Sequence, residues 1–227
     1  LHVRSRRQRQ MCIRDRHILG VAWFRNLELA VGPGVFVPRP ETELLAEYAV
    51  EALRAQAHPE PIGVDLGTGS GAIALSMATE VPHARVFAVE KSPEAAVWTR
   101  KNIAAYQGVV ELVEGDLADA LPELNGKVSV IASNPPYIPA AAIPRDPEVR
   151  LFDPEMALFG GEDGLDIVRD LSRTAMRLGH SGAMLILEHG ELQGAEIREL
   201  LAADGWRAPE TLRDLTTRDR YTRATRP

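Results

Sequence analysis

The chain has 227 residues, of which 45% are hydrophobic and 26% charged, and its formal net charge is −6. These values predict one globular domain, and the 5% of aromatic residues disfavours a surface that stacks nucleic-acid bases. The single cysteine, Cys12, excludes a disulfide framework and a cysteine-rich zinc site. No apolar run approaches 18 residues, so no membrane-spanning helix is predicted and a reduced, cytoplasmic setting is expected.

The first sixteen residues differ from the rest in charge. They hold six arginines and one acid, Asp15, so they contribute +5 and leave −11 for residues 17–227. They show no apolar periodicity and lack the apolar core of a signal peptide. A basic nucleic-acid or targeting arm is one interpretation. We favour the other, a disordered or non-native basic head at residues 1–16.

Residues 17–40 are expected to form a β-hairpin that links the head to the main domain. Two short apolar stretches are separated there by Gly32-Pro33-Gly34, a sequence typical of a turn. A helix is predicted to begin near Pro40, because acidic residues follow it and apolar residues then recur at helical spacing. The main domain is therefore placed at residues 41–227.

Strands and helices alternate through this domain. A proline-rich segment from 134 to about 163 is expected to be a long loop. The alternation predicts an α/β fold with right-handed crossovers and a doubly wound, mostly parallel sheet. The apolar runs place strands at 62–67, 85–90, 109–116, 127–133 and 182–190, helices between them, and two weaker strands in the 206–226 tail.

The first predicted strand ends in a glycine-rich loop, within the sequence VDLGTGSGA. Gly67, Gly69 and Gly71 would let the backbone turn sharply and approach a ligand, and the following helix would offer free N–H donors. Taken alone, the pattern also fits a dinucleotide-binding loop or a plain tight turn.

Acidic residues follow the next two strands. Glu90 stands 19 residues after Gly71, where a carboxylate can accept hydrogen bonds from ribose hydroxyls of either NAD or S-adenosylmethionine. Asp116 and Leu117 follow the third strand, where they could hold an adenine amino group and pack against its ring. A helix cap or turn is the alternative for Asp116.

The fourth strand ends in Asn134-Pro135-Pro136-Tyr137, beside the point where such sheets bind ligands. Proline fixes the backbone and removes N–H donors, so the carbonyl groups of Asn134 and Pro135 would be free to accept. With the Asn134 side-chain carbonyl they form a cluster of acceptors suited to an –NH2 group, and Tyr137 offers a flat face for a planar amide or base.

An acceptor cluster suits methyl transfer to nitrogen. The lone pair of an amide or aryl amine is delocalised, and two fixed acceptors would orient that nitrogen and raise its electron density. A sulfonium methyl group is already activated, so neither a metal nor a strong base is needed. The six histidines are scattered, and none has metal-ligand spacing.

The motifs together resemble those of a known family. GVFVPRPETELL, DLGTGSGAIAL, VEKSPEA, SNPPYIP and ILEHG occur in the order seen in the release-factor glutamine methyltransferases, the PrmC/HemK family, and the likeness covers about residues 17–226. The NPPY sequence also occurs in DNA adenine and ribosomal guanine N-methyltransferases. The PRPETE and LEHG segments are more specific.

The resemblance implies a seven-stranded class I, Rossmann-like methyltransferase sheet whose last strand is antiparallel. It implies methyl transfer from S-adenosylmethionine, leaving S-adenosylhomocysteine, to the glutamine amide in the Gly-Gly-Gln motif of peptide chain release factors, by a cytoplasmic monomer. The cofactor site would comprise Asp65, Gly67, Thr68, Gly69, Ser70, Gly71, Glu90, Asp116, Leu117 and Asn134. Asn134, Pro135 and Tyr137 would be catalytic, and the substrate site would add Pro136, Arg39 and Glu41.

The chain departs from the family in three places. The arginine-rich head stands where a small N-terminal helical domain usually ends, so most of that domain is expected to be lacking. Glu90 replaces an aspartate of many relatives, and Leu117 replaces an aromatic residue of some. Three alternatives remain open: a DNA or ribosomal RNA amino-methyltransferase, an NAD-dependent oxidoreductase, and a fragment that only binds S-adenosylmethionine. The charge of the body disfavours the first.

Overall fold

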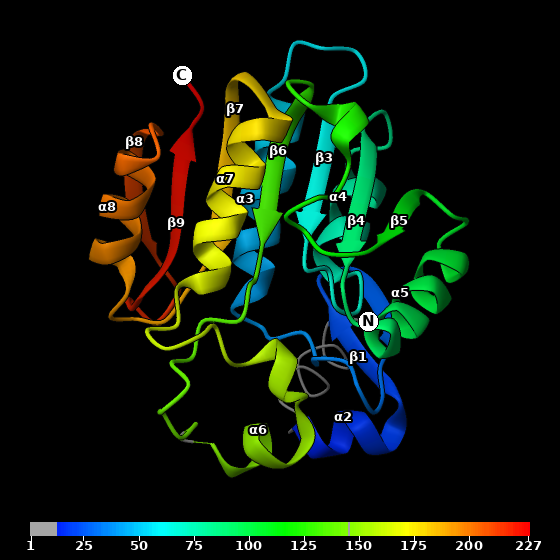
Figure 1. The fold of residues 1–227 in the computed structure, drawn as a ribbon. Coiled ribbons are helices and arrows are strands. Elements are labelled where there is room, and N and C mark those ends of the chain that lie inside the picture. Colours follow the sequence, from blue (N-terminus) through cyan, green and yellow to red (C-terminus); the bar gives the residue numbers. More distant parts are fainter. Residues whose placement is uncertain (1–12, 145) are drawn as a thin grey trace.

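A computed structural model describes residues 13–144 and 146–227. Its centre is a seven-stranded sheet with the order β5-β4-β3-β6-β7-β9-β8, flanked by helices on both faces (Figure 1). Neighbouring strands pair in parallel except β9, which is antiparallel to both β7 and β8. The predicted doubly wound α/β sheet is therefore confirmed. The strands are β3 (Ile62–Leu66), β4 (Arg85–Glu90), β5 (Val110–Glu114), β6 (Val128–Ser133), β7 (Gly179–Glu188), β8 (Arg207–Arg213) and β9 (Asp219–Thr225).

The two faces of the sheet support separate cores. Side chains alternate along β4, so Val86 and Ala88 pack against one set of helices, and Phe87 and Val89 against the other. The first core includes residues of α3 (Thr42–Arg54), α4 (Ala72–Glu80) and α5 (Pro93–Ala105). The second includes residues of α7 (Asp166–Leu178), α8 (Gly194–Ala203) and the short turn η1 (Pro122–Leu124).

A two-stranded hairpin precedes the sheet, formed by β1 (Val21–Phe24) and β2 (Leu27–Ala30). The hairpin was predicted, but its turn lies at Arg25 and Asn26 rather than at Gly32–Gly34. Arg25 has a φ of 50°, and its guanidinium bonds Glu80 on α4 while its backbone N–H bonds Glu43 on α3. These tertiary bonds stabilise a conformation that local preference alone would assign to glycine.

Helix α2 (Ile13–Leu19) precedes the hairpin. Residues 13–16, the last four residues of the predicted basic head, belong to this helix. Ile13 is buried, and the buried guanidinium of Arg16 donates to the carbonyl of Pro38 at 2.7 Å. Tertiary contacts therefore order a segment that has no apolar period of its own. Residues 1–12 of the predicted head, with Cys12, lie outside the described residues.

The segment after β6 was expected to be one long loop, but the structure shows that it is interrupted. It contains helix α6 (Pro147–Phe152) and the turn η2 (Glu155–Ala157), and Ile138 forms a bridge to Phe159. The carboxylate of Asp146 accepts from the Glu148 N–H at 2.9 Å, which caps α6 with proline at its first position. In Figure 1, α6 lies beside α2 at the carboxyl ends of the strands. Within the described ranges, no helix has both the length and the apolar character required to span a membrane.

Candidate active site

The predicted site residues lie at one edge of the sheet. β3, β4 and β6 run in parallel, so the glycine loop after β3, Glu90 at the end of β4 and Asn134 after β6 emerge at the same edge. β7 is parallel to β6 and brings Glu188 there too. This edge is the switch point at which doubly wound sheets bind ligands.

The glycine loop is open on its outer side. Gly67 and Gly69 have φ angles of 75° and 57°, in the left-handed region that favours glycine. A Cβ atom at either position would meet nothing within 4 Å, so space remains above the loop. The N–H groups of Gly67 and Thr68 both donate to the Val89 carbonyl, at 2.9 and 3.0 Å, which ties the loop to β4.

Asp65 holds this loop from below. Its Oδ2 atom accepts from the Thr68 hydroxyl at 2.6 Å and from the Ala74 N–H of α4 at 3.1 Å. Its Oδ1 atom is buried and has no hydrogen-bond partner among the described residues. Complete burial raises the pKa of the Asp65 carboxyl to about 7.

Glu90 is anchored by two backbone groups. Its Oε2 atom accepts from the Gly69 N–H and its Oε1 atom from the Ser92 N–H, both at 2.8 Å. Burial raises the pKa of the carboxyl and outweighs these two bonds, which favour the charged form. Each carboxylate oxygen can accept a second bond, so Glu90 can serve a ligand without leaving this position.

Asp116 and Leu117 lie one strand further along the edge. The Asp116 carboxylate is paired with Lys91 at 2.7 Å and accepts from the Ala118 N–H at 3.0 Å, and Lys91 lowers its pKa. The bond to Ala118 is the turn role that was considered as the alternative for this residue. Leu117 is half-buried against the second core.

Asn134 and Pro135 directly follow β6 at this edge of the sheet. The side-chain Nδ2 of Asn134 donates to the Thr42 hydroxyl at 3.2 Å, so its Oδ1 lies on the other side of the amide. Across the part of the chain that the structure describes, no hydrogen bond reaches this Oδ1 or the main-chain carbonyls of Asn134 and Pro135. Two consecutive residues therefore carry three acceptor oxygens that no described residue bonds.

Tyr137 and the half-buried Pro136 complete the segment. Burial raises the pKa of the Tyr137 hydroxyl well above its usual value, so the ring stays neutral.

Gln193 was missed by the sequence analysis. Its Nε2 donates to the Tyr137 carbonyl at 3.0 Å and its Oε1 accepts from the Gly190 N–H at 2.9 Å, which fastens the segment to the end of β7.

Two further residues, Thr42 and Glu188, were also missed. Glu188 ends β7 and is 3% exposed, and burial raises the pKa of its carboxyl to about 7. It accepts a bond from the Thr42 hydroxyl at 2.7 Å. The sequence did carry a signal for Glu188, because this acid directly follows the apolar run of residues 183–187. A charged group at the end of a buried strand is rarely buried without a partner.

Asn102 of α5 is the fourth residue that the sequence analysis missed. It is 2% exposed, and its amide donates to the carbonyls of Ser70 and Ala30 at 2.8 and 3.0 Å. Its Oδ1 accepts from the Ala30 N–H at 2.7 Å. One side chain thus joins the glycine loop to the hairpin, and a lone asparagine within a helix carries no sequence signal for this.

Arg39 and Glu41 have internal partners. Arg39 donates to the Val37 carbonyl at 2.9 Å, pairs with the buried Asp153 and lies over the Phe36 ring at 4.4 Å. Glu41 lies 3.7 Å from the Arg218 guanidinium. Arg39 lowers and Glu41 raises the pKa of both Tyr137 and Glu188 through their charges. Arg39 and Glu41 therefore lie on the Tyr137 side of the edge.

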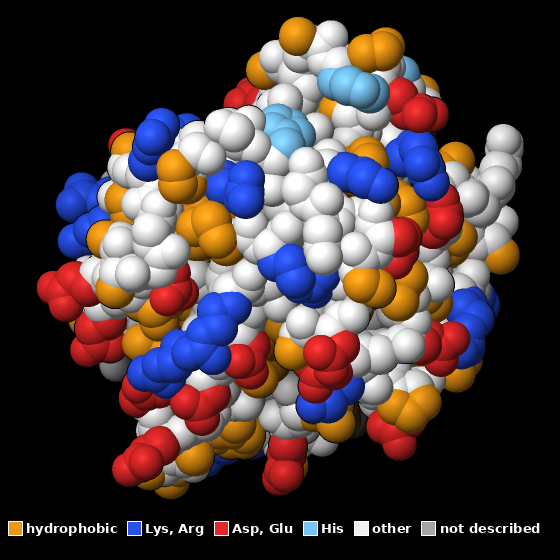
Figure 2. All heavy atoms as spheres, turned by 45° about the horizontal axis from the view of Figure 1, so that its top comes forward, with side chains coloured by type: hydrophobic (Ala, Val, Ile, Leu, Met, Phe, Trp, Pro, Cys, Tyr) orange, Lys and Arg blue, Asp and Glu red, His pale blue; other side chains and the backbone are white. Residues whose placement is uncertain are grey.

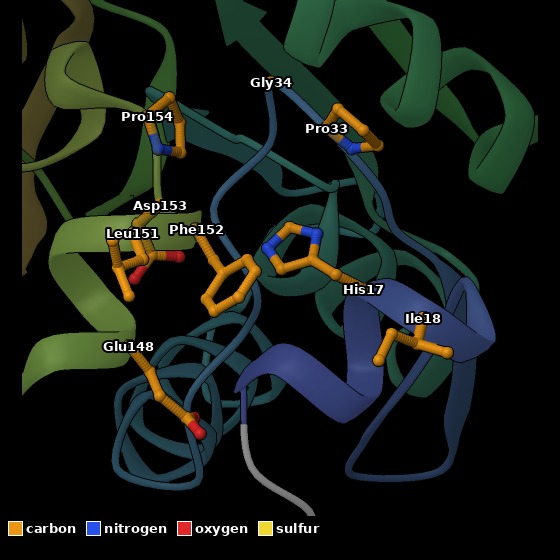
Figure 3. Close-up of a pocket in the computed structure, with 9 residues that line it drawn as sticks. All are labelled: His17, Ile18, Pro33, Gly34, Glu148, Leu151, Phe152, Asp153 and Pro154. Carbon is orange, nitrogen blue, oxygen red and sulfur yellow. The ribbon is translucent and has the colours of Figure 1, made fainter.

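A pocket of about 830 Å³ lies next to this region, between α2, α6 and the Pro33-Gly34 segment. Figure 3 shows His17 and Phe152 side by side in its lining, and their ring centroids are 6.0 Å apart. Its lining contains none of the site residues predicted from the sequence. The lining residues are His17, Ile18, Pro33, Gly34, Glu148, Leu151, Phe152, Asp153 and Pro154. The described residues hold no group of three or more possible metal ligands.

Comparison with known proteins gives consistent matches. Residues 27–152 match the family model described as methyltransferase small domain. A release factor glutamine methyltransferase of Streptomyces coelicolor is 50% identical over 210 residues, which cover 92% of this chain and 74% of the relative. A 4-amino-L-phenylalanine/4-methylamino-L-phenylalanine methyltransferase of Streptomyces pristinaespiralis is 42% identical, with 90% and 69% covered.

A solved structure agrees with these relatives. It is the release factor-specific protein-(glutamine-N5) methyltransferase of Alicyclobacillus acidocaldarius, 30% identical to this chain. The match has a TM-score of 0.53 and covers 86% of this chain and 98% of that one. The chain, with its glycine loop and NPPY segment at one sheet edge, belongs to the release factor glutamine methyltransferase family.

Proposed function

We propose that the protein transfers a methyl group from S-adenosylmethionine to the side-chain amide nitrogen of the glutamine in the Gly-Gly-Gln motif of peptide chain release factors. Family membership supports the reaction class, since several relatives of 40–50% identity are named for it. The observation that carries the proposal is the group of three acceptors at Asn134 and Pro135 to which no described residue donates a hydrogen bond.

The residues of the sheet edge suit S-adenosylmethionine. The open space above Gly67 and Gly69 admits a ligand close to the backbone, and the unpartnered Oδ1 of Asp65 is an acceptor suited to the ammonium group of its methionine part. Glu90 would accept from the ribose hydroxyls, and Asp116 with Leu117 would hold the adenine. Thr68, Ser70, Gly71 and Asn134 would complete the site. When bound, this cofactor supplies a methyl group activated by a sulfonium charge.

The acceptors define how the substrate is held. The side-chain carbonyl oxygen of Asn134 and the main-chain carbonyl oxygen of Pro135 would each accept from one N–H of the glutamine amide. These two bonds would fix the nitrogen and raise its electron density. Pro136 keeps the segment rigid, and Tyr137 packs on the planar amide. Methylation replaces one N–H hydrogen, and that proton leaves to solvent, so no strong base is required.

A second candidate substrate is a small aromatic amine. The Streptomyces pristinaespiralis relative is named for 4-amino-L-phenylalanine, whose ring-bound –NH2 group presents the same two donors to the same acceptors. Nucleic acid is disfavoured by the charge of −11 on residues 17–227. On the face shown in Figure 2, basic and acidic side chains are interspersed.

Methyl-labelled S-adenosylmethionine distinguishes these substrates. The protein is incubated separately with a release factor, the same factor with its motif glutamine replaced by alanine, 4-amino-L-phenylalanine, duplex DNA and ribosomal RNA. Label on the intact release factor that is lost with the alanine variant supports the proposal. Label on the amino acid alone, or on nucleic acid alone, overturns it.

A further inference from the structure

A continuous hydrogen-bond path runs behind Asn134 and joins three separate elements. The Asn134 amide, just after β6, donates to the Thr42 hydroxyl at the start of α3 at 3.2 Å. That hydroxyl donates in turn to Oε2 of Glu188, at the end of β7, at 2.7 Å. Thr42 and Glu188 are 4% and 3% exposed, so the bond between them is shielded from water.

We propose that Thr42 and Glu188 are positioning residues, which hold the Asn134 side chain in the one orientation that presents its oxygen to the substrate nitrogen. This inference rests on the proposed function. The two ends of an asparagine amide are nearly equal in size but opposite in hydrogen-bonding character. A turned amide would place its own –NH2 against the –NH2 of the substrate, where neither can accept.

The direction of the path follows from counting protons. Above its pKa of about 7 Glu188 is ionised and its carboxylate can only accept, so in that state the single hydroxyl proton of Thr42 is used on Glu188. The oxygen of Thr42 can then only accept from Asn134, which selects the Nδ2 end of the amide. The Oδ1 end is directed away, and no described residue bonds to it. Two bonds that never touch substrate thereby determine the character of the group that does.

Charges from the surrounding elements act on Glu188. Arg220 of β9 and Arg39 before α3 favour its ionised form, and Glu41 opposes it. Arg220 also donates to the main-chain carbonyl of His189 at 3.2 Å, next to Glu188 in the chain. The carboxylate is thus held near two cations while its bond to Thr42 sets the orientation of Asn134.

The test removes the hydroxyl and restores it. In Thr42→Val the shape is kept and the path is broken, whereas Thr42→Ser keeps the hydroxyl. We expect Thr42→Val to lower kcat on the release factor at least 10-fold, with KM and the Kd for S-adenosylmethionine within about 2-fold, and Thr42→Ser to restore most of kcat. Thr79→Val is the matched control, because the Thr79 hydroxyl donates within α4, to the Leu75 carbonyl at 2.7 Å.

A second readout needs no activity. The side-chain –NH2 signals of Asn134, identified by their loss in Asn134→Asp, are followed by NMR in the 15N-labelled protein. The inference expects these signals to shift in Thr42→Val and to return toward their original positions in Thr42→Ser. Thr42→Ala provides a second variant without the hydroxyl if the valine variant fails to fold, since alanine is favourable in a helix.

The outcomes separate the inference from the proposed function. If the unaltered protein methylates the release factor and Thr42→Val or Thr42→Ala turns over equally fast, the positioning role is wrong and the function stands. If the unaltered protein does not methylate the release factor, the proposed function is wrong. Independently of activity, unchanged Asn134 signals in Thr42→Val and Thr42→Ala would overturn the positioning role.

Discussion

The Gly69 backbone N–H donates to the Glu90 carboxylate across 2.8 Å, which joins the middle of the glycine loop to the end of β4. The same carboxylate accepts from Ser92 at the start of α5. Glu90 therefore sets the loop geometry as well as offering acceptors to a ligand, and its removal would affect both.

We expect Glu90→Ala to weaken S-adenosylmethionine binding by on the order of 10- to 100-fold, because charge-assisted hydrogen bonds are lost and the loop loses a tether. Isothermal titration calorimetry measures this. Glu111→Ala is the control, since Glu111 is exposed on β5 and pairs with Arg85. Equal affinity in the two variants would remove Glu90 from the cofactor site.

Asn134→Ala is expected to leave cofactor binding measurable and to lower turnover by on the order of 100-fold or more, comparable to the loss of a preorganised polar contact. Single-turnover transfer of labelled methyl to a release factor checks this. Asn125→Ala provides the comparison, because Asn125 bonds Arg177 away from the site edge. A turnover equal to that of the comparison variant would exclude Asn134 from its role.

Asn102→Ala should destabilise the fold by on the order of 2–4 kcal/mol, because it removes the hydrogen-bond partner of the buried Ser70 carbonyl and of both half-buried backbone groups of Ala30. Urea unfolding measures the loss, and the exposed neighbour Lys101→Ala should change the free energy of unfolding by under about 0.5 kcal/mol. A similarly small effect of Asn102→Ala would show that the bridge contributes little.

The burial of Glu188 predicts a pH-dependent stability. Its pKa in the folded protein is about 7, above the ordinary value of 4.5, so the folded state retains a proton that the unfolded chain releases. Glu188 therefore disfavours folding increasingly as the pH rises from about 5 to 8. Relative to the unaltered protein, Glu188→Gln should gain on the order of 2 kcal/mol of unfolding free energy over this interval, measured by urea titrations at both pH values. A constant difference would contradict the shifted pKa.

Arg39 and Asp153 form an ion pair in which the aspartate side chain is completely buried. Arg39→Ala leaves that carboxylate unpaired, and we expect a loss of about 3 kcal/mol in stability. In the double variant with Asp153→Asn, much of the loss should be recovered because no charge remains buried. A double-mutant cycle measures this coupling, and additive effects would argue that the pair is not coupled.

The amino-acid sequence by itself determined the α/β class, the sheet and the position of the glycine loop and NPPY segment at strand ends. These follow from apolar periodicity, and from glycine and proline, whose backbone preferences act locally. The hairpin turn at Arg25 and the helix at Pro147–Phe152 were placed wrongly or missed, because the ion pairs of Arg25 and the packing of α6 on α2 join segments far apart in the chain.

Only the tertiary structure decided which polar residues support the site. Asn102, Thr42, Glu188 and Gln193 stand on elements separated by long stretches of chain, and each acts through a hydrogen bond to a partner 32 or more residues away. Such bonds depend on distance and direction in space, and no local pattern encodes them. Periodicity shows where a strand ends, whereas the folded chain determines which side chains meet there and which atoms remain free to accept.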